Sequence, residues 1–244
     1  MTRTPISDVG HVVSTVASRR RHRRRGPPTS SRQQSGADWR PFAGRFRWLH
    51  LGIAHHLGWA VAITATADHH VADRRTLELI EPGVETAPIH HVGGPHQLHR
   101  AAEPFDDDAL AGLVADVRAS AVRASSTALD ELAAALPEPI TSMSLRSWPA
   151  DFPDDIAVQR RVPYESRADS VMYRQVLAQQ ARERGWVIHL YDAKTVRAEA
   201  ARILGEHATE VLREPRRHLG PPWTKDHQIA LAAAIVSDRG GPSD

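Results

Sequence analysis

Three short runs of apolar residues open the body of the chain and predict β-strands. They cover residues 48–53, 59–64 and 75–80, and they combine period-two alternation with residues that favour strands. Histidine, glycine and aspartate occupy the short segments between them, and Pro82 and Gly83 follow the third run. Because only short turns separate the runs, we expect a three-stranded antiparallel meander.

The pattern then changes to alternating helices and strands. Apolar side chains recur at helical spacing over residues 106–136, after three consecutive aspartates that favour a helix start. The later predicted elements are a strand at 140–145, a helix at about 165–184, a strand at 186–191, a short helix after Asp192, a mostly irregular link over 206–222 and a last helix after Thr224. This order predicts an α/β fold with a mixed five-stranded sheet flanked by helices.

Charge is distributed unevenly along the chain. The net charge is +2, but residues 1–47 hold 11 of the 31 basic and 2 of the 29 acidic side chains, which leaves 20 basic and 27 acidic side chains for the rest. Residues 19–25 read Arg-Arg-Arg-His-Arg-Arg-Arg and precede a segment rich in proline and serine. Because like charges repel and such segments build no core, we predict a disordered tail over residues 1–45.

Two interpretations of this tail remain open. It is either an arm that binds nucleic acid through Arg19 to Arg25, or an inert segment such as an over-extended translation start. The excess of 29 arginines over 2 lysines fits GC-rich coding sequence, which needs no selection for binding. We place the folded domain at residues 46–238 and a disordered C-terminus at 239–244. The acidic body repels phosphate backbones unless a local basic patch overcomes its charge.

Composition excludes several classes of site. There is no cysteine, so disulfides and thiolate metal sites are excluded, which fits a reducing cytoplasm. No run of about 18 apolar residues is present, so we expect a cytoplasmic protein with no membrane partner. The chain lacks a phosphate loop, a dinucleotide glycine fingerprint and a nucleophile elbow. Nothing in the sequence indicates a particular protein partner.

Two segments carry a resemblance to a known superfamily. Residues 51–63 read Leu-Gly-Ile-Ala-His-His-Leu-Gly-Trp-Ala-Val-Ala-Ile, and residues 225–235 read Lys-Asp-His-Gln-Ile-Ala-Leu-Ala-Ala-Ala-Ile. With the order of elements, they resemble the RNase H-like superfamily, and within it the RuvC-type resolvases, over about residues 47–237. The body is also similar to uncharacterised proteins of GC-rich bacteria with a Gly-Trp-Ala turn and a Pro-Pro-Trp-x-Lys-Asp ending. The resemblance implies an RNase H-like sheet.

The resemblance also implies a catalytic site, of which this chain keeps little. Members hold two Mg²⁺ or Mn²⁺ ions with carboxylates from the first strand, the fourth strand and the last helix, and the ions activate water. Here Ala54 stands at the first-strand position, the fourth strand has no acid and ends near Arg146, and only Asp226 matches a family carboxylate. We therefore expect a pseudo-nuclease, a degenerate module that associates with nucleic acid or with another protein.

In a second hypothesis the chain is an active enzyme. In a divergent metal-dependent phosphodiester hydrolase, Asp226 is the catalytic carboxylate and binds the metal together with His55 or His56, and Asp73 is a further candidate. The cofactor is then Mg²⁺ or Mn²⁺, although histidine ligands favour a softer metal such as Zn²⁺. The structural alternative for Asp226 is an acid in the first helical turn, which stabilises its own helix.

Two residues near these positions are candidates for ligand binding. Lys225 can hold a phosphate, and its alternative is a solvated side chain in the first turn of the last helix. Trp59 can stack on a base, and its alternative is packing in the core. We expect Arg174, on the helix at about 165–184, to be exposed to solvent.

A third hypothesis is a non-catalytic, histidine-rich metal-binding protein. Histidines occur in the pairs 55–56, 69–70 and 90–91, followed by His96 and His99. No helical His-x-x-x-His pattern is present, so a Zn²⁺ site requires these turns to converge.

Overall fold

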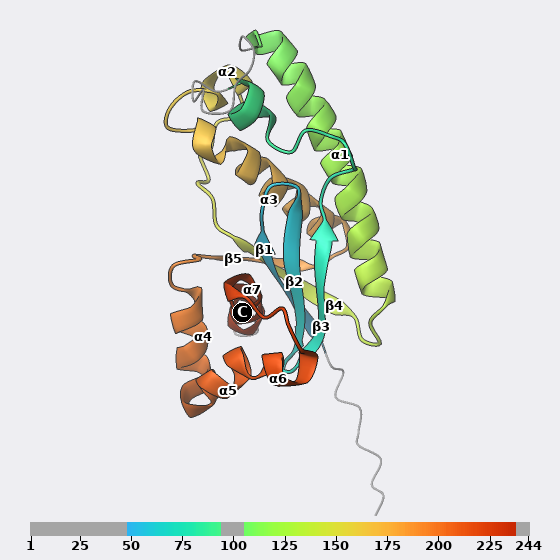
Figure 1. Ribbon diagram of the computed structural model, residues 1–244, viewed down its shortest axis with the longest axis vertical. Coiled ribbons are helices and arrows are strands. Elements are labelled where there is room, and N and C mark those ends of the chain that lie inside the picture. The colour runs from blue at the N-terminus through green and yellow to red at the C-terminus, as the bar shows by residue number, and fades with distance from the viewer. Residues whose placement is uncertain (1–47, 94–104, 238–244) are drawn as a thin grey trace, which may run out of the picture. The chain divides into compact units, whose positions relative to one another are not determined.

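The computed structural model describes residues 48–93 and 105–237 (Figure 1). The predicted tail of residues 1–45 and the predicted C-terminal segment 239–244 lie outside these residues, as do His96 and His99. In the part of the chain that is described, no helix has the length and apolar character needed to cross a membrane.

A mixed five-stranded sheet forms the centre of the fold and confirms the predicted α/β class. An antiparallel meander is formed by β1 (Leu49–His55), β2 (Trp59–Thr66) and β3 (Val71–Glu78). β4 (Ile140–Arg146) runs parallel to β1, and β5 (Val187–Tyr191) runs parallel to β4. The resulting order, β3-β2-β1-β4-β5, is consistent with an RNase H-like arrangement.

Two long helices cover one face of the sheet. They are α1 (Asp107–Ala134) and α3 (Glu165–Glu183), and both lie on the same side of the strands in Figure 1. Leu51 and Ile53 of β1 share one buried cluster with Leu129 of α1 and Val176 of α3. Because side chains alternate along a strand, every second residue of β1 contributes to this core.

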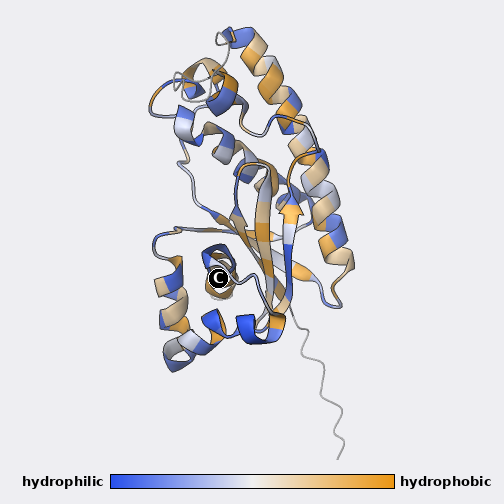
Figure 2. Cartoon of the chain, in the orientation of Figure 1, coloured by the Kyte–Doolittle hydropathy of each residue, from blue (hydrophilic) through white to orange (hydrophobic). Residues whose placement is uncertain are grey.

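The last helix covers the other face of the sheet. α7 (Lys225–Ser237) packs against β1 and β2 and against α4 (Val196–Leu204). All residues from Ile229 to Ile235 are buried, as expected for an alanine-rich helix that is apolar on every side. Figure 2 shows hydrophobic colours along the central strands. α7 approaches β1 so closely that a Cβ atom on Gly52 would lie 1.8 Å from the carbonyl oxygen of Ala230.

Several short helices lie where the sequence predicts loops. The expectation of a mostly irregular link over 206–222 is wrong, since η2 (Gly205–His207), α5 (Ala208–Arg213) and α6 (Pro215–Leu219) occupy most of it. Proline stands at the first position of α6, where its missing N–H breaks no helical hydrogen bond. Two further short helices are η1 (Ile89–Gly93) and α2 (Ile156–Gln159).

β3 begins earlier than the apolar pattern indicates. The predicted strand covers 75–80, whereas the observed strand starts at Val71 and includes the polar residues Asp73, Arg74 and Arg75. β3 is an edge strand, so its side chains are less buried and its pairing with β2 does not require an apolar sequence.

Candidate functional site

The carboxyl ends of the three parallel strands lie at one edge of the sheet. β1 ends at His55, β4 at Arg146 and β5 at Tyr191, and Arg146 is paired with Tyr191 in the sheet. The first turn of α7 reaches the same edge, because Asp226 contacts His56. Open α/β sheets commonly bind ligands at this edge. We refer to the following residues as the carboxyl edge: His55, His56, Arg146, Ser170, Arg174, Tyr191 and Asp226.

His56 and Asp226 meet at the carboxyl edge. The Nε2 atom of His56 lies 3.2 Å from Oδ2 of Asp226, across 170 residues of sequence. The indole of Trp59 stacks on the His56 ring with the ring centroids 4.1 Å apart and an angle of 10° between the planes. Trp59 is 37% exposed, so it lies at the surface and not in the core. The pair therefore presents an aromatic face to solvent next to a carboxylate.

His55 points to the opposite face of the sheet. Its Nε2 atom lies 3.0 Å from the Oγ atom of Ser170 on α3, because successive residues of an extended chain point in opposite directions. Burial, followed by the charges of Arg174, Arg146 and His56, lowers the pKa of His55 from 6.5 to about 3. The imidazole is therefore neutral at pH 7. Of the two adjacent histidines, the structure brings only His56 to Asp226.

Arg174 is a buried cation, and the expectation that it is exposed is wrong. Only 6% of its surface is accessible. Its guanidinium donates hydrogen bonds to the carbonyl oxygen of Ser170 at 2.9 Å, to Ser170 Oγ at 3.1 Å and to the carbonyl oxygen of Ser147 at 2.6 Å. Burial, followed by the charge of Arg146, lowers the pKa of Arg174 to about 10, so it stays charged at pH 7. None of its partners among the described residues is a carboxylate.

A second cation, Arg146, stands at the end of β4. Its charge contributes to the lowered pKa values of both His55 and Arg174. Arg146 is exposed, and within residues 48–93 and 105–237 its side chain has no hydrogen bond or ion pair. Tyr191, its neighbour on β5, donates a hydrogen bond from its hydroxyl to the carbonyl oxygen of Ile53 at 2.7 Å, and burial raises the pKa of that hydroxyl. Arg146 is thus the accessible positive charge of this edge.

The donor set of the carboxyl edge does not fit a pair of hard cations. Mg²⁺ and Mn²⁺ require several oxygen ligands, and Asp226 is the single carboxylate in this set. Ala54 occupies the first-strand position where the resemblance implies an acid, β4 carries no acid and ends at Arg146, and two arginines repel a divalent cation. In the described part of the chain, no group of three or more histidine, aspartate or glutamate side chains is arranged to hold a metal ion.

Lys225 and Asp73 are the two other residues predicted for the site. Lys225 is the first residue of α7 and is exposed. Asp73 lies on β3, which is separated from β1 by β2, and both of its carboxylate oxygens accept hydrogen bonds from Arg75 at 2.7 and 2.8 Å. The structure therefore gives Asp73 an ion-pair partner on its own strand.

The other two described histidine pairs lie in two separate segments of the chain. His69 and His70 belong to the turn between β2 and β3, at the end of the meander opposite to His56. His91 lies in η1, and its Nδ1 atom is 2.9 Å from Oε1 of Glu85. The main-chain N–H of His90 donates to Asp169, whose pKa is raised to about 6 mainly by burial. Each pair thus has different neighbours.

The contribution of α3 to the site was missed from the sequence. Ser170 and Arg174 are one helical turn apart, so both can face the end of β1. One signal was available: Val171 and Ala178, three positions before and four after Arg174, are apolar and widen the hydrophobic stripe of the helix around it. An arginine inside such a wide stripe indicates burial and not exposure.

No protein-family model matches this chain. A search of curated proteins also gives no match.

Proposed function

We propose that this chain is a catalytically degenerate RNase H-like module that binds the phosphate groups of nucleic acid at its carboxyl edge. One observation carries the proposal: Arg146 and Arg174, two arginines without a carboxylate partner among the described residues, lie at the edge of the sheet where the resembling family gathers acids. A buried cation is costly unless an anion or several hydrogen bonds compensate its charge. Carbonyl and hydroxyl oxygens of Ser147 and Ser170 compensate Arg174 only in part.

Arg146 and Arg174 favour the binding of an anionic ligand in two different ways. Arg146 is exposed and offers a guanidinium, which binds phosphate oxygens through charge-assisted hydrogen bonds. Arg174 is held in place by its bonds to α3 and to the end of β4, and adds positive potential beneath the edge.

The stacked pair of His56 and Trp59 supports nucleic acid as the source of the phosphate. Aromatic faces at a surface stack on unpaired bases, and this contact tolerates any sequence. A single-stranded segment can present both a base to Trp59 and phosphates to Arg146. Because the body carries 20 basic and 27 acidic side chains, we expect binding by this edge to be weak and sensitive to salt.

The test compares two arginines that differ in position but not in charge. Binding of the full chain to a labelled single-stranded DNA of about 12 nucleotides is followed by fluorescence anisotropy over a series of salt concentrations. We expect Arg146→Ala to weaken binding several-fold and to reduce the slope of log K against log salt by about one. Arg182→Ala, an exposed arginine in the last turn of α3, is the matched control. Equal effects of both substitutions would contradict the proposal.

The distance between His56 and Asp226 favours one rival, the divergent metal-dependent hydrolase. The separation of 3.2 Å between His56 Nε2 and Asp226 Oδ2 supports this rival, because both atoms are close enough to bind one metal ion. That hypothesis requires further ligands from outside the described residues. It predicts Mn²⁺-dependent cleavage of nucleic acid that is abolished by Asp226→Ala, whereas the phosphate-binding proposal predicts binding without cleavage.

A further inference from the structure

β3 is an edge strand with one side of its backbone unpaired. It is hydrogen-bonded to β2 alone among the described strands. In the antiparallel ladder, the amide of Leu79 donates to the carbonyl oxygen of Gly58, and the register then pairs Leu77 with Ala60 and Arg75 with Ala62. Since hydrogen-bonded pairs alternate, the residues between them direct their backbone groups outward. These residues are Arg74, Thr76 and Glu78.

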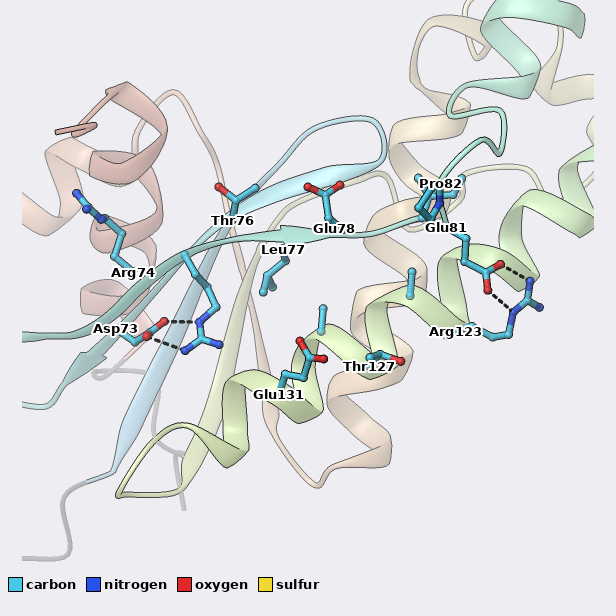
Figure 3. A pocket seen from close by; sticks show the side chains of 14 residues that line it. Asp73, Arg74, Thr76, Leu77, Glu78, Glu81, Pro82, Arg123, Thr127 and Glu131 are labelled. Carbon is cyan, nitrogen blue, oxygen red and sulfur yellow. Dashed lines mark hydrogen bonds and ion pairs between the residues drawn. The ribbon is translucent and has the colours of Figure 1, made fainter. Parts of the chain in front are cut away.

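A groove runs along this unpaired side of β3. It has a volume of about 670 Å³ and lies between the strand and α1. In Figure 3, Leu77 points from β3 toward α1, whereas Thr76 and Glu78 point to the other side of the strand. The helix contributes Ala124, Thr127 and Ala128, whose small side chains leave room beside the strand.

Ion pairs mark the two ends of the groove. At one end Arg75 donates two hydrogen bonds to Asp73, and at the other Arg123 donates two to Glu81, as the dashed lines in Figure 3 show. The side chain of Arg74 is engaged elsewhere, because it donates to main-chain carbonyl oxygens of residues 219, 220 and 222. The arginines of the groove are therefore already bonded to groups of this chain.

Two carboxylates of the groove have no such partner. Glu78 on β3 and Glu131 on α1 make no hydrogen bond or ion pair within residues 48–93 and 105–237, although the charge of Glu131 acts on Arg75. Glu78 and Thr76 are exposed, while Leu77 between them is buried. The groove is lined by four acidic and three basic side chains, so it combines outward backbone groups with a net negative charge. That combination fits an extended chain with basic side chains.

We propose that β3 docks an extended, lysine- or arginine-bearing segment of a partner protein, which pairs with it as a sixth strand. The backbone of the segment bonds to the outward groups of Arg74, Thr76 and Glu78. Alternate side chains then face the two sides of the sheet, one toward Glu131 and the other toward Glu78. This surface is separate from the carboxyl edge, and the proposal does not rest on the function proposed above.

The experiment uses a synthetic probe, because the partner is unidentified. The probe is a labelled, end-capped peptide of about seven lysine and valine residues with lysines at neighbouring positions, so that lysines face both sides of the sheet, and it spans the outward residues of β3. Its twin carries N-methyl groups on alternate amides, so that it keeps the charge but cannot pair along one side. Binding of each peptide to the full chain is measured by fluorescence anisotropy. We expect the twin to bind at least about tenfold more weakly.

Two double variants distinguish binding at the groove from a general attraction between the basic peptide and acidic side chains. The double variant Glu78→Gln with Glu131→Gln is expected to bind the unmodified peptide at least about fivefold more weakly than the wild type does. The control removes two exposed carboxylates outside the groove, Glu206→Gln with Glu210→Gln, and is expected to have little effect. Equal binding of the two peptides, or equal effects of the two double variants, would overturn the proposal.

Thr76→Pro tests the same surface without a change of charge. It removes one outward N–H, and proline is tolerated on edge strands. We expect weaker peptide binding with an unchanged melting temperature. Sedimentation of the full chain at rising concentration gives the competing outcome. Self-association that Thr76→Pro abolishes would assign β3 to a second copy of this chain, and would overturn the proposal of a basic partner segment.

Discussion

The protonation of His55 is set by its surroundings at the residue scale. Its pKa is about 3 in the folded chain, against 6.5 for an exposed imidazole, and burial is the main cause. Between these values the unfolded chain binds a proton that the folded chain does not. The stability that depends on neutral His55 is therefore fully present above pH 6.5 and is lost as the pH falls toward 3.

This difference predicts a pH-dependent free energy of unfolding. Between pH 7 and pH 5 we expect the free energy of unfolding of the wild-type chain to fall by about 2 kcal/mol more than that of His55→Gln. The variant has no group to protonate at this position. Urea unfolding at the two pH values measures the difference. His207→Gln, an exposed histidine, is the control and should keep the wild-type slope. Parallel slopes for wild type and His55→Gln would show that His55 is not held neutral.

Sequence alone placed some residues of the site and not others. Matching short motifs located Asp226, showed Ala54 at a position expected to be acidic, and showed a fourth strand without an acid that ends near Arg146. It could not show that His56 is the histidine that meets Asp226, because a single residue of register decides which side of the sheet each histidine faces. The burial of Arg174 depends on how α3 lies against β1 and β4, which no local pattern contains.

At the scale of elements, the contact between β1 and α7 fixes the position of Asp226. A Cβ atom on Gly52 would lie 1.8 Å from the carbonyl oxygen of Ala230 and 2.8 Å from its carbonyl carbon. These are main-chain atoms and cannot rotate away, so any side chain at this position separates the helix from the sheet. Gly52 thereby sets the depth at which α7 packs.

We predict that Gly52→Ala destabilises the fold by about 3 kcal/mol, because the added methyl group forces α7 outward. Denaturant unfolding measures this loss. Gly112→Ala is the matched control, since Gly112 lies in α1 with no atom within 4 Å of its added Cβ. It should be neutral or stabilising by up to about 1 kcal/mol. A Gly52→Ala variant as stable as Gly112→Ala would contradict the packing described for α7.

The elements themselves were largely predictable, for identifiable reasons. The meander, β4, β5, α1 and α3 each carry a clear apolar period or a run of strand-forming residues, and α7 is a continuous apolar stretch, as the core requires. The failures are short or peripheral. α5 and α6 lack a strong apolar face, and the start of β3 is polar because it pairs through its backbone at an edge of the sheet.

At the scale of the whole molecule, two surfaces of opposite charge character belong to one sheet. The carboxyl edge holds Arg146 and Arg174, whereas the groove beside β3 is lined by four acidic and three basic side chains, and Glu78 and Glu131 accept no hydrogen bond from the described residues. The summed charge of the body hides this separation. Because the two surfaces are separate and differ in charge, an anionic ligand and a basic protein segment can bind without competing.

Asp226 gives the most direct test of the central claim, because the two interpretations of the carboxyl edge predict opposite signs. If the edge binds phosphate, the Asp226 carboxylate repels the ligand, and Asp226→Asn strengthens binding. If the edge binds a metal for hydrolysis, the same carboxylate is required. The substitution itself should cost only about 0.3–1 kcal/mol of helix stabilisation, so the fold is kept.

The measurement is the affinity of the full chain for labelled single-stranded DNA, for wild type and Asp226→Asn, with EDTA and with Mn²⁺. We predict that Asp226→Asn binds about twofold to fivefold more tightly in EDTA, and that neither protein cleaves the DNA in Mn²⁺. Weaker binding by Asp226→Asn, or Mn²⁺-dependent cleavage by the wild type that the variant lacks, would contradict a phosphate-binding edge and identify a hydrolase.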